Sequence, residues 1–396
     1  MTTPALFPFP PSNNSLNMGT LFFGGGCSCT LGHRVAVPHF RFLRGDPMLS
    51  PETLAAPKTS PQDFGRMMQL ATGMGVTAAL QPIARMKIAD LLSHGPLPVA
   101  DLAERTHSNA DALYRVMRLL ASAGVFEEHP SRVFGLTPMS ELLRSDTPGS
   151  LRDFIIWVSN RFHLDVWSAL GYSIETGQPA VEKVTGRPCF DAIFGEPAVA
   201  ADFNHAMTCF SRLIAPSLLD AYDFSGIGIL MDVAGGHGAI LCDVLFRYPK
   251  MKGILFDLPN VVHEANCNIC AKKLNERCLT VTGDFFENIP AGADAYYMQH
   301  IIHDWADEPA LKILGNVRRA LENRPEGRLL LVDSVVAEDS APDPAKWLDL
   351  EMLLMPGGRE RTAAEWLALL GKANFEISRI IPIGMGKSVI EARVQR

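Results

Sequence analysis

The chain has 396 residues, of which 47% are hydrophobic, and it carries a formal net charge of −7. This length accommodates two domains, and the acidic balance argues against a general nucleic-acid-binding surface. Its apolar runs are too short to span a bilayer. The eight cysteines show no disulfide-module spacing, which favours the reducing cytoplasm.

Residues 1–60 have a different composition from the rest of the chain. Pro, Ser, Asn and Gly recur there, and no period of 3.6 or 2 holds. We expect an extension without regular structure, with Met48 as an alternative initiator. The triplet Gly24-Gly25-Gly26 has no flanking strand, so we assign it no phosphate-binding role.

Residues 61–150 indicate a small helical domain. Apolar spacing predicts long helical structure over 63–93 with a kink at Pro82, a short helix over 99–105, and a further helix begun by the capping-box-like Ser108-x-x-Asp111. A hairpin is expected over 125–136, which completes a winged-helix arrangement. Such a domain can bind DNA, but only Arg115 and Arg118 are basic on the relevant helix. We therefore favour a packing or dimerisation module.

Residues 151–222 are helical and rich in aromatic side chains. Most of these rings belong in a core by default. Others are expected to line an apolar ligand pocket between domains, where such sites tend to form.

From residue 223 onward, apolar strands alternate with amphipathic helices, which is typical of a doubly wound parallel sheet. Strands are predicted at 227–233, 252–257, 278–282, 294–299, 328–335, 375–382 and 388–394. Helices are predicted at 239–248, 260–273, 307–323 and 362–373. The last two strands are joined by so short a connection that they must form an antiparallel hairpin.

A glycine-rich loop follows the first strand of this sheet, in the run Asp232-Val-Ala-Gly235-Gly236-His-Gly238. Glycines there let the backbone turn sharply against a ligand, and Asp257, which closes the next strand, can take both hydroxyls of a ribose. The dinucleotide fingerprint fails because its third glycine position is Leu241. A loop without a pyrophosphate site favours S-adenosylmethionine as the cofactor.

His303 follows the fourth strand and is the candidate general base. The carboxyl ends of parallel strands carry the ligand crevice, and a neutral imidazole there can take the proton of a phenol or enol. Asp333 and Glu360 also follow strands or lie in loops at that edge, so either could orient the ring. Asp304 and Asp307 are interpreted as caps of the following helix.

Three other features are weaker candidates for a catalytic or metal-binding role. His300 and His237 are expected to have structural or surface roles. Cys267-x-x-Cys270, with Cys278 and His263 nearby, could hold zinc, but a second paired knuckle is absent, so we expect no metal.

From about residue 64 to the end, the chain resembles the small-molecule O-methyltransferases of the caffeate, isoflavone and acetylserotonin type. Five motifs in the family's order carry the likeness: Asp232-Val-Ala-Gly-Gly-His-Gly238, Phe256-Asp-Leu-Pro259, Gly283-Asp284-Phe285-Phe286, His303-Asp-Trp305 and Pro356-Gly-Gly-Arg-Glu-Arg-Thr362. The resemblance implies methyl transfer from S-adenosylmethionine to a small aromatic or polyketide-like hydroxyl compound, with no metal and with His303 as base between Asp333 and Glu360. It also implies a homodimer formed through the N-terminal domain.

The resemblance further assigns roles to individual positions. It implies cofactor contacts at Ser211, Asp232, Gly235, Gly236, Gly238, Asp257, Leu258, Asp284, Phe285 and Gln299, and acceptor contacts at Trp167, Phe203, Met207 and Asp304. The domains expected on this basis are the extension at 1–60, a winged-helix dimerisation domain at 61–150, a helical connector that lines the acceptor pocket at 151–222, and a methyltransferase domain at 223–396.

Three positions depart from the family's pattern. Ala234 stands where a first glycine is common, Gln299 replaces a usual Lys or Arg, and Asp333 replaces a commoner Glu. Because a fold does not fix a reaction, two alternatives stay open. One is a divergent relative that binds the cofactor but catalyses hydroxylation or decarboxylation, and the other is a winged-helix regulator that senses the cofactor.

Overall fold

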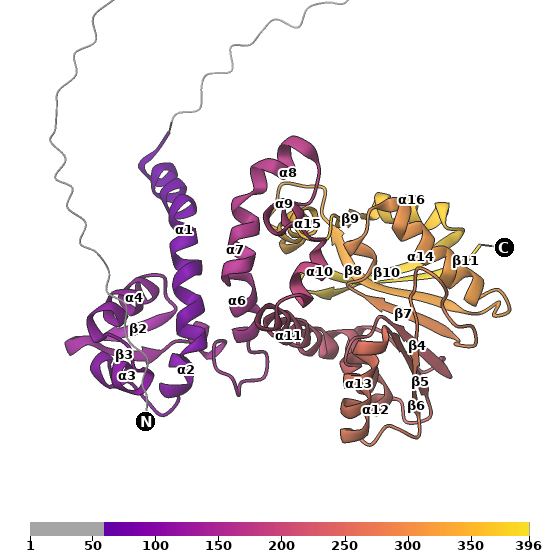
Figure 1. Cartoon of the computed structure of the whole chain (residues 1–396), viewed down its shortest axis with the longest axis horizontal. Helices are drawn as coiled ribbons and strands as arrows, with labels where there is room; N and C mark the ends of the chain where they lie inside the picture. Colours follow the sequence, from indigo (N-terminus) through magenta and orange to yellow (C-terminus); the bar gives the residue numbers. More distant parts are fainter. Residues whose placement is uncertain (1–58, 396) are drawn as a thin grey trace, which may run out of the picture. The chain divides into compact units, whose positions relative to one another are not determined.

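The computed structural model describes residues 59–395, so the extension expected at 1–60 lies almost entirely outside the described residues, as does the triplet at 24–26. Within the described part of the chain, no helix is long and apolar enough to cross a membrane. The described residues include a small, mainly helical group of elements and a large sheet covered by helices (Figure 1).

The first group contains a long helix, a helix pair and a three-stranded sheet. Its elements are α1 (Pro61–Arg85), α2 (Ile88–Leu91), β1 (Leu97–Pro98), α3 (Val99–Thr106), α4 (Ala110–Ser122), β2 (Phe126–His129), η1 (Pro130–Arg132), β3 (Val133–Leu136) and α5 (Pro138–Glu141). The predicted hairpin is confirmed, since β2 pairs antiparallel with β3, and β1 adds a strand that the sequence did not predict. The sheet order is β1-β3-β2.

Two local expectations in this group were wrong. The helical region expected over 63–93 is not continuous, because it breaks at Lys87, whose backbone is left-handed with φ 54°. Pro82 lies inside α1, and the kink expected there stays a prediction. The cap of α4 is Asn109, whose side chain accepts the N–H of Ala112, because the hydroxyl of Ser108 is hydrogen-bonded to Thr106 instead.

Six helices connect this group to the sheet. They are α6 (Arg152–Val158), α7 (Arg161–Ser168), α8 (Leu170–Thr176), α9 (Ala180–Thr185), α10 (Cys189–Phe194) and α11 (Pro197–Ala221). They share an aromatic core with α15 (Pro344–Leu354), in which Trp157, Phe203 and Leu354 pack together. The sequence did not predict α15.

The large sheet has the strand order β10-β11-β8-β7-β4-β5-β6, and β9 pairs with β8. Its strands are β4 (Ile229–Val233), β5 (Lys252–Asp257), β6 (Cys278–Thr282), β7 (Ala295–Gln299), β8 (Arg328–Val336), β9 (Arg361–Thr362), β10 (Phe375–Gly384) and β11 (Lys387–Val394). All seven predicted strands are confirmed within two residues at each end. The terminal hairpin is also confirmed as antiparallel, and β11 lies between β10 and β8.

Both faces of this sheet are buried, as expected for a doubly wound fold. Alternate residues of β8 pack into the cores on opposite faces of the sheet. Leu330 packs with α11, α12 (Ala239–Arg247) and α13 (Pro259–Ala271). Its neighbours Leu329 and Leu331 pack with α14 (Asp307–Ala320) and α16 (Ala363–Lys372) on the opposite face (Figure 1). This layering leaves the carboxyl ends of the parallel strands free to carry side chains for a site.

Candidate active site

The glycine loop between β4 and α12 is shaped by close backbone contacts. A Cβ at Gly235 would overlap the carboxyl group of Asp232 and the side chain of Leu255, so only glycine fits there. Gly236 is left-handed, with φ 57°, and a Cβ there would meet open space. Ala234 is left-handed as well, with φ 57°, which explains physically why glycine is common at that position.

Asp257 closes β5 directly beside this loop. One carboxyl oxygen accepts the N–H of Gly236 at 2.9 Å and the other accepts the N–H of Leu258 at 2.7 Å. Burial raises the pKa of Asp257, and these backbone hydrogen bonds oppose the shift. Burial also raises the pKa of Asp232, at the end of β4, to about 7, with a further contribution from Asp257.

The other predicted cofactor residues lie on several elements. Asp284 and Phe285 follow β6, and the carboxyl group of Asp284 accepts the N–H of Phe286 at 2.7 Å. Gln299 ends β7 and accepts the hydroxyl hydrogen of Tyr297 at 2.6 Å. Ser211 lies in α11, and across residues 59–395 its side chain makes no hydrogen bond.

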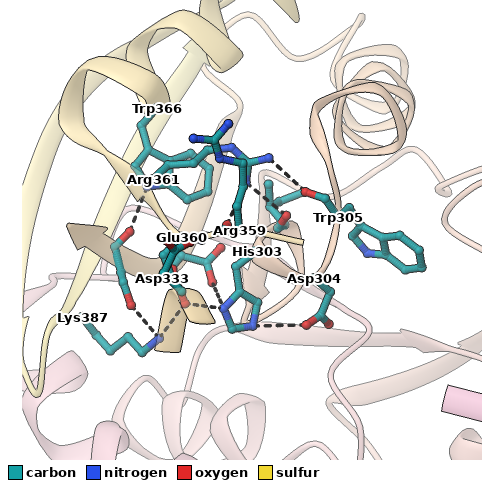
Figure 2. A network of polar contacts seen from close by, with 12 residues as sticks. His303, Asp304, Trp305, Asp333, Arg359, Glu360, Arg361, Trp366 and Lys387 are labelled. Atoms are coloured by element: carbon teal, nitrogen blue, oxygen red, sulfur yellow. Dashed lines mark hydrogen bonds and ion pairs between the residues drawn. The ribbon is translucent and has the colours of Figure 1, made fainter. Parts of the chain in front are cut away.

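His303 lies in the short helix η2 (Ile302–Asp304) after β7, with its side chain only 6% exposed. Its Nδ1 lies 2.6 Å from Oε1 of Glu360 and 3.9 Å from Oδ1 of Asp333, whereas Nε2 lies 3.5 Å from Oδ1 of Asp304. Figure 2 shows the three carboxylates around the imidazole ring. The contact with Glu360 is by far the shortest, so this residue orients the ring.

The loop that holds Glu360 lies directly against the backbone of η2. A Cβ at Gly358 would overlap the carbonyl oxygen of His303, and the N–H of Arg359 donates to that oxygen at 2.8 Å. The buried guanidinium of Arg361 donates to the carbonyl oxygen of Trp305 at 2.9 Å. The motif Pro356-Gly-Gly-Arg-Glu-Arg-Thr362 thus fixes Glu360 relative to His303.

Electrostatics favour the protonated form of His303. Burial alone lowers the pKa of this imidazole, but the carboxylates of Glu360, Asp304 and Asp333 outweigh burial and raise the pKa to about 9. Burial raises the pKa of Glu360, yet the charges of His303 and Lys387 lower it overall. Asp333 shifts in the opposite direction, because burial raises its pKa and its carboxyl oxygens have no hydrogen-bond partner among the described residues.

Lys387 was missed by the sequence analysis. This lysine begins β11, is 6% exposed, and lies 3.7 Å from Oε1 of Glu360 and 2.9 Å from Oγ of Ser334. It pairs with Ser334 in the register between β11 and β8. Nothing in the sequence around this lysine predicts its contact with Glu360, because only the order of the strands brings the lysine to the edge of the sheet where Glu360 lies.

Two interpretations of residues near His303 were wrong. Neither Asp304 nor Asp307 caps α14, because the N-cap is Ala306 and has no side-chain hydrogen bond. Asp304 faces the imidazole, and Asp307 binds Arg361 at 3.0 Å. His300, for which a structural or surface role was expected, has a left-handed backbone, with φ 55°, and its ring stacks on His303 at 5.3 Å between centroids. This position is compatible with a structural role next to the base.

The predicted substrate residues lie in the aromatic core. Phe203 packs edge-on against Trp157 at 5.3 Å, and Met207 packs against the same cluster. Trp167 donates its indole N–H to Glu351 at 2.7 Å. Phe190 links this core to Trp305, beside the base, at 6.5 Å.

The residues at the loop fit a cofactor that has a ribose and a positive charge. The glycine cradle has no room for a side chain at Gly235. The buried carboxylate of Asp257 lies beside it, and among charged side chains only His237 influences its pKa in the described part of the chain, by lowering it. No group of three or more potential metal ligands lies among residues 59–395.

Comparisons with known proteins agree with this geometry. An O-methyltransferase domain model matches residues 167–376, and an O-methyltransferase dimerisation domain model matches residues 44–146. The chain is 38% identical to phenazine O-methyltransferase PhzM of Lysobacter antibioticus over 83% of this chain and 95% of that protein. It is 32% identical to 3-amino-4-hydroxybenzoate 4-O-methyltransferase of Streptomyces cremeus, over 86% of this chain and 92% of that enzyme.

Solved structures give the same result. CalO1, a methyltransferase of calicheamicin biosynthesis solved with S-adenosylhomocysteine (SAH) bound, superposes with a TM-score of 0.75 and 31% identity over 86% of this chain and 100% of that one. The expected fold class and cofactor are therefore confirmed. The chain belongs to the S-adenosylmethionine-dependent O-methyltransferase family.

Proposed function

We propose that this enzyme methylates a hydroxyl group of a small aromatic or polyketide-like acceptor and that His303 is its general base. The observation that carries the proposal is the buried contact of 2.6 Å between His303 and Glu360, located at the carboxyl edge of the sheet that also carries the glycine loop. The phenazine and aminohydroxybenzoate enzymes to which the chain is similar support an aromatic acceptor.

The proton transfer follows from the ring's orientation. An ionised carboxylate only accepts hydrogen bonds, so Glu360 keeps a hydrogen on Nδ1 and leaves Nε2 of His303 as the basic atom. Nε2 takes the hydroxyl proton, which would let the acceptor oxygen bond to a methyl carbon as the bond between that carbon and sulfur breaks. S-adenosylmethionine, when bound, supplies that methyl group on a positively charged sulfur. The imidazolium that forms is stabilised by Glu360 and Asp304.

The same proposal assigns the cofactor's contacts. Asp257 would bind the ribose hydroxyls, because each of its oxygens has a lone pair left after the bonds to the backbone. The loop at Gly235, Gly236 and Gly238 would accommodate the methionine part, with Asp284 and Phe285 beside the adenine.

We also propose a homodimer formed through the N-terminal region. Four large apolar side chains of α1 are 62–76% exposed, namely Phe64, Met67, Leu70 and Met74. A stripe of this kind on one helix marks an interaction surface, and it lies within the match to the dimerisation domain.

Turnover by variants tests the role of the base. Wild-type protein, His303→Ala and His205→Ala are incubated with labelled S-adenosylmethionine and a panel of phenols, flavonoids and quinones. We expect His303→Ala to lose activity by at least about 100-fold, the usual contribution of a general base, while cofactor affinity is retained. His205 is exposed on α11 and serves as the matched control. Full activity of His303→Ala would show that the base is misassigned.

A further inference from the structure

A buried pair of ionisable side chains lies in the aromatic core and has no part in the proton transfer described above. Nε2 of His163, on α7, lies 3.1 Å from Oε2 of Glu351, on α15, and the two side chains are 1% and 8% exposed. The indole N–H of Trp167 donates to the same oxygen at 2.7 Å. Trp167 and Glu351 are 184 residues apart in the sequence, so this hydrogen bond joins distant segments of the chain.

Within the described residues, His163 is the only side chain capable of positive charge that lies within 4.0 Å of Glu351. Burying a carboxylate is costly unless a cation or several donors compensate it. Across residues 59–395, no lysine or arginine lies within 4.0 Å of Glu351, and Nδ1 of His163 is buried without a hydrogen-bond partner. Holding α7 against α15 would not need a charge, because a glutamine could accept the same bond from Trp167.

Ring contacts connect this pair to the proposed base. The indoles of Trp167 and Trp347 stack at 5.7 Å with 9° between their planes. From there, contacts between ring centroids of 6.4, 4.9, 6.1 and 5.3 Å continue to the base in the order Trp347, Phe154, Phe210, His300 and His303.

A second connection passes through Cys189 on α10. After burial, the charges of Asp304 and Glu351 both raise the pKa of this thiol. The carboxylate beside His303 and the carboxylate of the pair therefore act on one buried atom. Both connections put Glu351 in the same aromatic region as the methyl-transfer site.

We propose that His163 and Glu351 form the polar end of the acceptor site and bind a protonated amine that the acceptor carries apart from its reacting hydroxyl. An ammonium group brings a positive charge to this carboxylate and donates up to three hydrogen bonds. This inference rests on the proposed function, since it names the class of acceptor for that site.

Binding of three isosteric probes tests the inference without requiring turnover. The probes are 6-(aminomethyl)-2-naphthol, 6-(hydroxymethyl)-2-naphthol and 6-ethyl-2-naphthol, titrated calorimetrically into the full chain saturated with SAH. A hydrogen bond to a charged group contributes more than a neutral one, so we expect the amine to bind at least about tenfold more tightly than the ethyl compound. The neutral hydroxymethyl probe is expected to gain no more than about threefold.

Glu351→Gln is expected to reduce the preference for the amine to within about twofold. Glu182→Gln, at an exposed glutamate of α9, should leave it unchanged. Equal binding of all three probes to the wild-type protein, no binding of any, or an unchanged preference in a folded Glu351→Gln protein would each overturn the inference. If the Glu351→Gln protein does not fold, the comparison of the three probes on the wild-type protein still tests the inference. Failure of the proposed function would be seen in a different measurement, as the absence of methyl transfer to every hydroxylated acceptor.

Discussion

Glu360→Gln is the substitution that most directly tests how the base is tuned. The glutamine amide can still accept the hydrogen bond from Nδ1 of His303, so the ring keeps its tautomer, but the negative charge at 2.6 Å is lost. A hydrogen bond to a charged group contributes about 1.5–3 kcal/mol and a neutral one about 0.5–1.5 kcal/mol. The difference, about 1–1.5 kcal/mol, corresponds to about one pKa unit.

Two effects on activity follow, and they have opposite signs. The pKa of His303, about 9 in the wild-type protein, should fall by about one unit, so the variant has more neutral base at neutral pH. Above that pKa, the imidazolium formed during transfer is less stabilised, and kcat should fall up to about tenfold. The signature is therefore a shifted pH profile together with a lower plateau.

The assay is the initial rate of methyl transfer at saturating cofactor, measured from about pH 6 to pH 10, where a base of this kind titrates. Glu322→Gln, at an exposed position after α14, is the control for carboxylate loss elsewhere. A profile of Glu360→Gln that coincides with wild type, in both midpoint and plateau, would refute the coupling of Glu360 to the base.

Asp257→Asn should weaken S-adenosylmethionine binding at least about tenfold by calorimetry, because it removes a charged acceptor; near-normal affinity would contradict its assignment. Lys387→Met removes the ammonium group 3.7 Å from Glu360 and should lower the free energy of unfolding by about 3 kcal/mol, which urea unfolding measures. Ala234→Gly removes the strain of a left-handed alanine, which costs about 1–2 kcal/mol, but it adds unfolded-state entropy worth about 0.5–1 kcal/mol. Urea unfolding should therefore show a small net increase in the free energy of unfolding, and a clear decrease would argue against strain there. The pKa of His303 is raised from 6.5 to about 9, which gives a stabilisation of about 3 kcal/mol that is present below pH 6.5 and lost as the pH rises through 9. Unfolding free energies of the wild-type protein should therefore decline over that window, and a flat profile would contradict the raised pKa.

The sheet was predictable because its pattern is local. Each buried strand is a short apolar run between glycines, prolines or helices, and burial of both faces needs apolar residues at consecutive positions. His303 and Asp257 could be placed for the same reason, since the carboxyl end of a strand can be read directly from where its apolar run stops.

Residues whose position depends on distant pairing could not be found in this way. Lys387 reaches Glu360 only because β11 is inserted between β10 and β8, which places it opposite Ser334. Glu351 lies on α15, where flanking prolines and aspartates obscure the helical pattern in the sequence, and Leu354 of this helix packs into the aromatic core. Neither position carries a signal in the neighbouring sequence.

The electrostatics of the site also suit the direction of the proposed reaction. Asp304, Asp333 and Glu360 surround His303 and favour positive charge there, with Lys387 offsetting only part of their field. When neutral His303 accepts the acceptor's proton, it gains a positive charge, and a bound S-adenosylmethionine would lose the positive charge of its sulfur as the methyl group leaves. Because fixed charges that need no rearrangement stabilise a transition state best, a base held at a high pKa among carboxylates is compatible with transfer from a positively charged donor.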